Sequence, residues 1–110
     1  MGFLGDRLKA TRAGEDFVKR LRFPTGTPQQ ATEAGRALKM VVYRAYLAGL
    51  EGASLTDRLG EFLLRFGDGL TAAQRADLGP EALRTAMHNI ETAYRYGFER
   101  GATERASRSD

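Results

Sequence analysis

The sequence contains no cysteine and no tryptophan, and it has a single histidine, His88. Without cysteine the chain has no disulfide, no thiolate nucleophile and no metal site with sulfur ligands. One histidine does not make a metal site, because such sites need several ligands at set spacings. We therefore expect no metal and no cofactor, and we interpret His88 as a surface or half-buried polar residue. The lack of cysteine also fits a reducing compartment, so we expect a cytoplasmic protein.

Motifs that carry catalysis are missing as well. The sequence has no G-x-S-x-G nucleophile motif, no phosphate-binding P-loop and no dinucleotide fingerprint. The GDG at 67–69 offers one carboxylate and lacks the pattern of a calcium loop. We therefore expect that the protein is not an enzyme and acts on no small-molecule substrate.

Long apolar runs are also absent, and none approaches the roughly 20 residues of a membrane-spanning helix. Charges come too early in the opening MGFLGDRLKATRAG for a secretory signal. Hydrophobic residues make up 42% of the chain and charged residues 28%, which is typical of a soluble globular protein. A length of 110 residues predicts one domain.

Helical periodicity is what the sequence does contain, whereas alternating strand patterns are lacking. The predicted fold is all-α: a single compact domain at 1–104, with four to five helices in a small bundle and a long C-terminal helix. The polar tail at 105–110 is expected to fray. We expect helices over residues 6–22, 28–50, 54–66, 71–79 and 80–104.

Turn and capping residues set these boundaries. Thr27 and Gln30 form a capping box around Pro28, which suits the first position of a helix. Gly52 is expected to end the same helix. Gly79 ends the short helix, and Pro80 then begins the long one.

A repeated phrase, AYLAGLE at 45–51 and AYRYGFERG at 93–101, places glycine on helix faces that should be buried. Glycine is a poor helix former, so its presence on such a face indicates close approach by another element. Ala45 and Gly49 form a small-residue notch that matches the second phrase. Packing between the two helices is the favoured interpretation; an internal duplication and an interface with another chain stay open. In the last helix, the residues that share the face expected to be buried are Leu83, Met87, Ile90, Tyr94, Gly97 and Gly101.

The helix at 28–50 carries apolar residues on two opposite faces. A helix of this kind is either buried centrally or uses one face for a partner. Arg36, Lys39 and Arg44 border the second face, and an apolar stripe rimmed by Arg and Tyr has the composition of a protein interface. Both interpretations stay open. The first face carries Ala34, Leu38, Val41, Val42 and Ala45, and the second carries Met40, Tyr43, Leu47 and Leu50.

These patterns predict a non-catalytic interaction protein, a small subunit or adaptor in a larger complex. A nucleoprotein and a self-assembled complex both stay open as the kind of complex. We expect a protein partner or self-association. The candidate contact residues are Arg36, Lys39, Met40, Tyr43, Leu47 and Leu50, with Tyr96 and Arg100 on the outer side of the last helix.

Nucleic-acid binding without sequence preference is the alternative function. The net charge of +3 is concentrated at the N-terminus, and a basic array holds phosphates without any motif. Glu15 and Asp16 interrupt this array. Polar residues at the packing positions of LTAAQRADLGPEALRTAM argue against a helix-turn-helix. The candidate phosphate-binding residues are Arg7, Lys9, Arg12, Lys19, Arg20 and Arg22.

Peripheral binding to a membrane surface is a third alternative, through an amphipathic segment at 3–23. Arg7, Glu15 and Arg22 intrude on its apolar face, which weakens this alternative. Its apolar residues are Phe3, Leu4, Leu8, Phe17 and Leu21.

Overall fold

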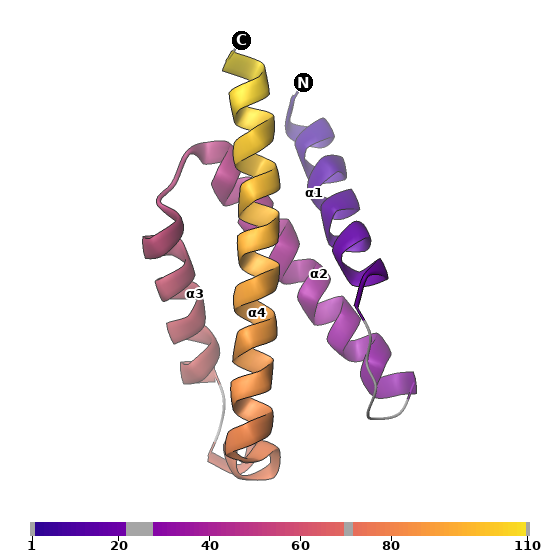
Figure 1. The fold of residues 1–110 in the computed structure, drawn as a ribbon, viewed down its shortest axis with the longest axis vertical. Helices are drawn as coiled ribbons and strands as arrows, with labels where there is room; N and C mark the ends of the chain where they lie inside the picture. Colours follow the sequence, from indigo (N-terminus) through magenta and orange to yellow (C-terminus); the bar gives the residue numbers. More distant parts are fainter. Residues whose placement is uncertain (1, 22–27, 70–71, 110) are drawn as a thin grey trace.

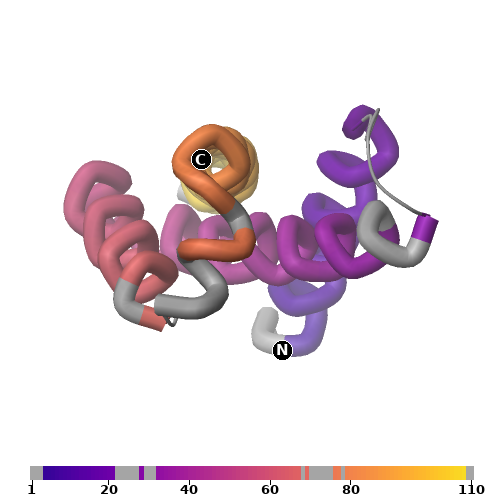
Figure 2. Tube along the Cα trace, turned by 90° about the horizontal axis from the view of Figure 1, so that it is seen from below, coloured from indigo at the N-terminus to yellow at the C-terminus, as the bar shows by residue number. Residues whose placement is uncertain are grey.

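Four helices form the described part of the computed structural model, which covers residues 2–21, 28–69 and 72–109. No strand occurs in these ranges, so the all-α prediction is confirmed. The long C-terminal helix is the spine of the molecule; the second helix crosses it, and the first and third lie on its opposite sides (Figures 1 and 2). The helices are α1 (Gly2–Lys19), α2 (Pro28–Glu51), α3 (Leu55–Gly69) and α4 (Ala72–Ser109).

The first helix lies earlier in the chain than predicted. It begins at Gly2 and ends at Lys19, whereas the sequence predicted residues 6–22. The backbone N–H groups of Arg20 and Leu21 donate to the carbonyls three residues before them, both at 3.1 Å. This tighter pattern is typical of a helix end, and it stops α1 three residues before the predicted position.

The end of α2 follows the prediction closely. Gly52 has a φ of 78°, a conformation that favours glycine. The N–H of Gly52 donates to the carbonyl of Gly49 at 3.1 Å, and that of Ala53 donates to Ala48 at 3.2 Å. These two bonds form a Schellman motif, which satisfies the last carbonyls of the helix. At the other end of α2, the predicted cap at Thr27 lies outside the described residues, as does the side chain of Gln30.

The third helix begins at its predicted cap. The Oγ of Ser54 accepts a hydrogen bond from the N–H of Asp57 at 3.4 Å, which satisfies one free amide of the first turn. Gly79, with φ 76° and ψ 164°, then breaks the last helix just before Pro80. The predicted break between the helices at 71–79 and 80–104 is therefore present as a kink inside α4. The predicted cap at Thr71 lies outside the described residues.

The C-terminal tail was predicted to fray from residue 105, and this prediction differs from the structure. The last helix continues to Ser109. Arg105 donates a hydrogen bond to the carbonyl of Leu50 at 3.3 Å, and Arg108 pairs with Asp6 and Glu104. These contacts with α1 and α2 hold the final turns, which local sequence alone does not reveal.

Glycine brings α2 and α4 into backbone contact. A methyl group placed on Gly101 would overlap the carbonyl of Tyr46, and one on Gly97 would overlap that of Val42. In the opposite direction, one on Gly49 would overlap the carbonyl of Phe98. The repeated phrases therefore pack against each other within one chain, and the packing interpretation is confirmed.

A second close approach joins α1 to α2. A methyl group on Gly14 would lie 3.0 Å from the carbonyl oxygen of Lys39. Ala10 and Ala13, on the same side of α1, are completely buried. Small side chains thus let both α1 and α4 approach α2 closely. The larger buried residues that complete the core are Phe17, Leu38, Val41, Val42, Tyr46, Leu59, Ile90 and Tyr94.

Candidate interaction surface

The structure divides the second apolar face of α2 between core and solvent. Tyr43, Leu47 and Leu50 are half-buried and pack against the core. Met40 on the same face has 54% of its surface exposed. The face is therefore neither wholly buried nor wholly free, and its open part lies around Met40 and Leu47.

This open part faces a groove of about 580 Å³ formed by α2, α3 and α4. Met40 and Leu47 line it from α2, and Phe62 and Phe66 line it from α3. Tyr94 of α4 contributes to the same groove, with its ring centroid 5.3 Å from that of Phe62. Burial raises the pKa of the Tyr94 hydroxyl, so this group stays neutral at physiological pH. The groove thus has an apolar lining supplied by three helices.

Charged residues form its rim. Near the turn between α2 and α3, Arg58 pairs with Glu51 at 3.5 Å and links the two helices. Arg44 lies seven residues before Glu51 on α2, and Arg65 lies seven residues after Arg58 on α3. Seven residues are two helical turns, about 10 Å along each axis. Arg44 and Arg65 therefore lie at a similar level on opposite walls of the groove.

The two arginines are available to bind a partner. Both are exposed, and within the described part of the chain neither has a hydrogen bond or an ion pair. Glu61, also on the rim, is likewise exposed and without an ion pair among those residues. With Glu51 and Arg58 neutralising each other, the remaining rim charge is one positive unit: two arginines against one glutamate.

The other predicted contact residues on α2 do not line the groove. Arg36 and Lys39 are exposed and lie close in sequence to the groove residues of α2. The backbone of Lys39 contacts Gly14 of α1. The groove therefore unites Met40 and Leu47 of the predicted set with Arg44, which was recognised only as a border residue.

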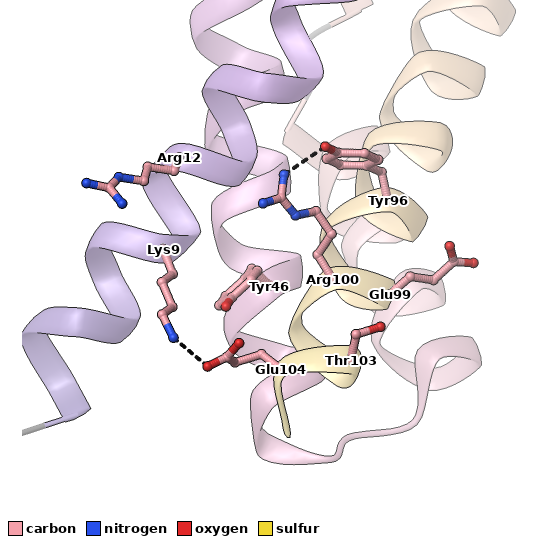
Figure 3. Close-up of a pocket in the computed structure, with 8 residues that line it drawn as sticks. All are labelled: Lys9, Arg12, Tyr46, Tyr96, Glu99, Arg100, Thr103 and Glu104. Atoms are coloured by element: carbon pink, nitrogen blue, oxygen red, sulfur yellow. Dashed lines mark hydrogen bonds and ion pairs between the residues drawn. The ribbon is translucent and has the colours of Figure 1, made fainter. Parts of the chain in front are cut away.

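Tyr96 and Arg100, expected on the outer side of the last helix, lie instead where α1 meets α4. The ring of Tyr96 packs on Phe17 with centroids 5.1 Å apart. Arg100 donates to Asp16 at 2.9 Å and to the hydroxyl of Tyr96, also at 2.9 Å. Figure 3 shows the second of these bonds. Arg20 also lies over the Tyr96 ring, at 5.8 Å from its centroid. These side chains are engaged in contacts within the chain.

A second hollow, of about 560 Å³, lies between α1 and α4 and is polar (Figure 3). Lys9 points across it to Glu104, whereas Arg12 points away from the group. Tyr46 reaches it from α2, and burial raises the pKa of its hydroxyl. Because cations and carboxylates both line the hollow, it has no uniform charge with which to attract a ligand.

Three ion pairs join α1 to the C-terminal half of α4 in this region. They are Asp6 with Arg108, Lys9 with Glu104 and Asp16 with Arg100. Hydrogen bonds from the basic partner lower the pKa of each carboxyl group below its ordinary value. We call these three pairs the α1 clasp.

The predicted phosphate-binding cations are not gathered into one free array. Lys9 belongs to the α1 clasp, and Arg20 lies over Tyr96. Arg7 has interactions within the chain, while Arg12 and Lys19 are exposed. Arg22 lies outside the described residues.

The apolar face considered for membrane binding is also divided. Phe17 is buried and Leu21 packs against the core, so both are used inside the molecule. Leu4 and Leu8 stay outside, with 76% and 53% of their surfaces exposed. The side chain of Phe3 lies outside the described residues. Among the described helices, none has the length and apolar character required to cross a bilayer.

The role of α3 in the groove was not anticipated from the sequence. The sequence predicted a helix here and did not say what its apolar residues contact; of the described side chains of α3, only Leu59 is buried. Phe62 and Phe66 are half-buried and line the groove. Two large aromatic residues on a helix of 15 residues were the available signal.

Comparison with known proteins finds no matching family model, no matching curated sequence and no matching solved structure. The functional argument therefore depends on this chain alone. Within the described residues, no group of three or more His, Asp or Glu side chains is placed to hold a metal ion.

Proposed function

We propose that the protein is a non-catalytic interaction module, a small subunit or adaptor that binds a protein partner in the groove between α2 and α3. The observation that carries this proposal is the apolar groove itself. Exposed or half-exposed large side chains line it, among them Met40, Leu47, Phe62 and Phe66.

The physical reason is the free energy of burying these side chains. Covering apolar surface contributes roughly 25 cal/mol per Å², and aromatic residues, methionine and arginine are enriched where proteins bind one another. The groove offers all three residue types in one place. A rim of arginines also suits a contact that excludes water at its centre and stays polar at its edge.

A photocrosslinking experiment tests this proposal. Met40 is replaced by the photoreactive residue p-benzoylphenylalanine, and the full chain is expressed and irradiated in cells of its source organism. We expect an adduct of defined mass containing a second protein. The matched control carries the same residue in place of Arg84, which is exposed on α4 and is not part of the groove.

The result with Met40→Glu completes the test. Because Met40 is more than half exposed, this variant should keep its fold and lose the partner in co-purification with the protein identified by crosslinking. Adducts of equal yield at positions 40 and 84, or no adduct at position 40, would contradict the proposal.

A further inference from the structure

We infer that the partner enters the groove as an amphipathic helix whose apolar face is flanked by carboxylates. This inference rests on the proposed function and adds the chemical class of the partner. It follows from the shape of the groove and from the two exposed arginines on its opposite walls.

The shape of the groove favours a helix. Two helices, α2 and α3, form its walls, and a helix laid in such a groove inserts apolar residues spaced three and four apart. The apolar lining extends from Leu47 and Phe62 to Met40 and Phe66, which is more than one turn on each wall. Side chains from successive turns of one partner helix would therefore find apolar contacts.

The charge of the rim favours carboxylates. At the end of the groove next to the α2–α3 turn, Arg58 and Glu51 pair with each other, and Glu61 leaves the rim as a whole with one positive unit. Two turns further along, Arg44 and Arg65 face the groove from opposite sides without an ion pair in the described chain. An arginine presents a planar fork of donors that matches a carboxylate. Acidic residues on both flanks of the partner helix would satisfy both arginines.

A second copy of this chain fits less well. The exposed side of α4, the longest helix, carries acidic and basic residues together, as in the pair of Glu91 with Arg95. A helix face of mixed sign brings arginine as well as glutamate toward Arg44 and Arg65, and like charges repel. The structure therefore favours a foreign acidic helix over self-association.

The test uses two dye-labelled peptides of about 16 residues, long enough to form helix when capped. The acidic probe has leucine at positions spaced three and four apart and glutamate on both flanks of this face. The basic probe has lysine in place of each glutamate. Fluorescence anisotropy measures the affinity of the full chain for each probe, at low and at high salt.

We expect the affinity for the acidic probe to be about tenfold higher than for the basic probe. A few exposed ion pairs together contribute a free energy of this size. The preference should shrink as salt rises, because exposed charges are screened. The double variant Arg44→Glu/Arg65→Glu should reverse the preference. The double variant Arg44→Gln/Arg65→Gln should bring the ratio of the two affinities close to one. Arg84→Glu, which makes the same change outside the groove, should leave the preference as in the unaltered protein.

Three results would overturn the inference. They are equal affinity for both probes, no binding of either probe, and the same preference in the charge-reversed variant. Mass measurement by light scattering adds a fourth: a dimer that Met40→Glu converts to monomer identifies a second copy as the occupant. None of these results changes whether a protein crosslinks at position 40 in cells. The photocrosslinking experiment therefore tests the proposed function separately from this inference.

Discussion

Single glycine residues decide how closely the helices approach. At Gly101 the carbonyl of Tyr46 occupies the space of a methyl group, and this neighbour is backbone that cannot rotate away. Gly60 on α3 is also helical, but a methyl group placed on it would meet no atom within 4 Å. Alanine substitutions at these two positions therefore distinguish the effect of close packing from the effect of helix propensity.

We predict opposite effects of alanine at these two sites. Gly101→Ala should lower the free energy of unfolding by roughly 1–3 kcal/mol, because overpacking forces the α2 and α4 backbones apart. Gly60→Ala should raise it by about 0.5–1 kcal/mol, since alanine is the better helix former and meets no obstacle. Urea denaturation followed by circular dichroism measures both values. A stabilised Gly101→Ala would contradict the close contact between α2 and α4.

A second pair of residues separates core from surface on α2. Leu38 is buried, so Leu38→Ala should cost about 2–5 kcal/mol through lost contacts and a cavity. Met40 lies two positions further on and is exposed, so Met40→Glu should change stability by no more than about 0.5 kcal/mol. Thermal melts of both variants provide the comparison. A large loss in Met40→Glu would show that the groove is closed in solution.

At the scale of helices, the sequence predicted where helices begin and end better than it predicted which helices contact one another. Local signals such as Ser54, Gly52 and Gly79 act within a few residues of a helix end, and they gave correct boundaries. The extension of α4 to Ser109 depends on Asp6, which is 102 residues away from Arg108 in the chain. Periodicity contains no information about such a partner.

The groove was predictable only on one side for the same reason. The second apolar face of α2 contains Met40 and Leu47, and its arginine border indicated an interface. That Phe62 and Phe66 would form the opposite wall depends on the angle between α2 and α3, which no local pattern specifies. Tyr96 and Arg100 show the converse, because a face that looks outward on one helix is covered by another, α1.

The α1 clasp makes the docking of α1 sensitive to acid. Asp6, Asp16 and Glu104 have a lowered pKa in the folded protein, so their ionised forms stabilise it at pH values above their ordinary pKa. As the pH falls through the lowered values, protonation removes this contribution. We predict that stability declines between about pH 5 and pH 2.

Denaturation by urea at a series of pH values measures this decline. The triple variant Asp6→Asn/Asp16→Asn/Glu104→Gln should show a flatter dependence on pH in that range, because the titrating groups of the α1 clasp are gone. High salt should reduce the difference between the two proteins, since these pairs are exposed. An unchanged slope in the triple variant would contradict the role of the α1 clasp.

The whole molecule is elongated along α4. Its principal extents are 49, 29 and 19 Å, and its radius of gyration is 14.8 Å. A compact chain of about 100 residues has a radius of gyration near 13 Å. The excess has a simple source, because the part of α4 after the kink at Gly79 is a long helix and the other helices do not reach along its full length (Figure 1).

Small-angle X-ray scattering should therefore give a radius of gyration close to 14.8 Å for the isolated protein. The radius of gyration should not depend on concentration if the groove binds a foreign helix and not a second copy of the chain. A value that rises with concentration, together with a doubled mass, would indicate association of copies. Met40→Glu serves as the control, since it alters the groove and leaves the helices in place.

The α1 clasp joins α1 to residues of α4 that the ribosome adds to the chain much later. Lys9 and Glu104 are 95 positions apart in the chain. A nascent chain emerges from its N-terminus, so α1 can pack on α2 long before the end of α4 exists. Until then Lys9 has no carboxylate from α4, and the notch at Gly49 has no backbone to fill it. The contacts between α1 and α4 therefore form only after the C-terminal turns of α4 have been synthesised.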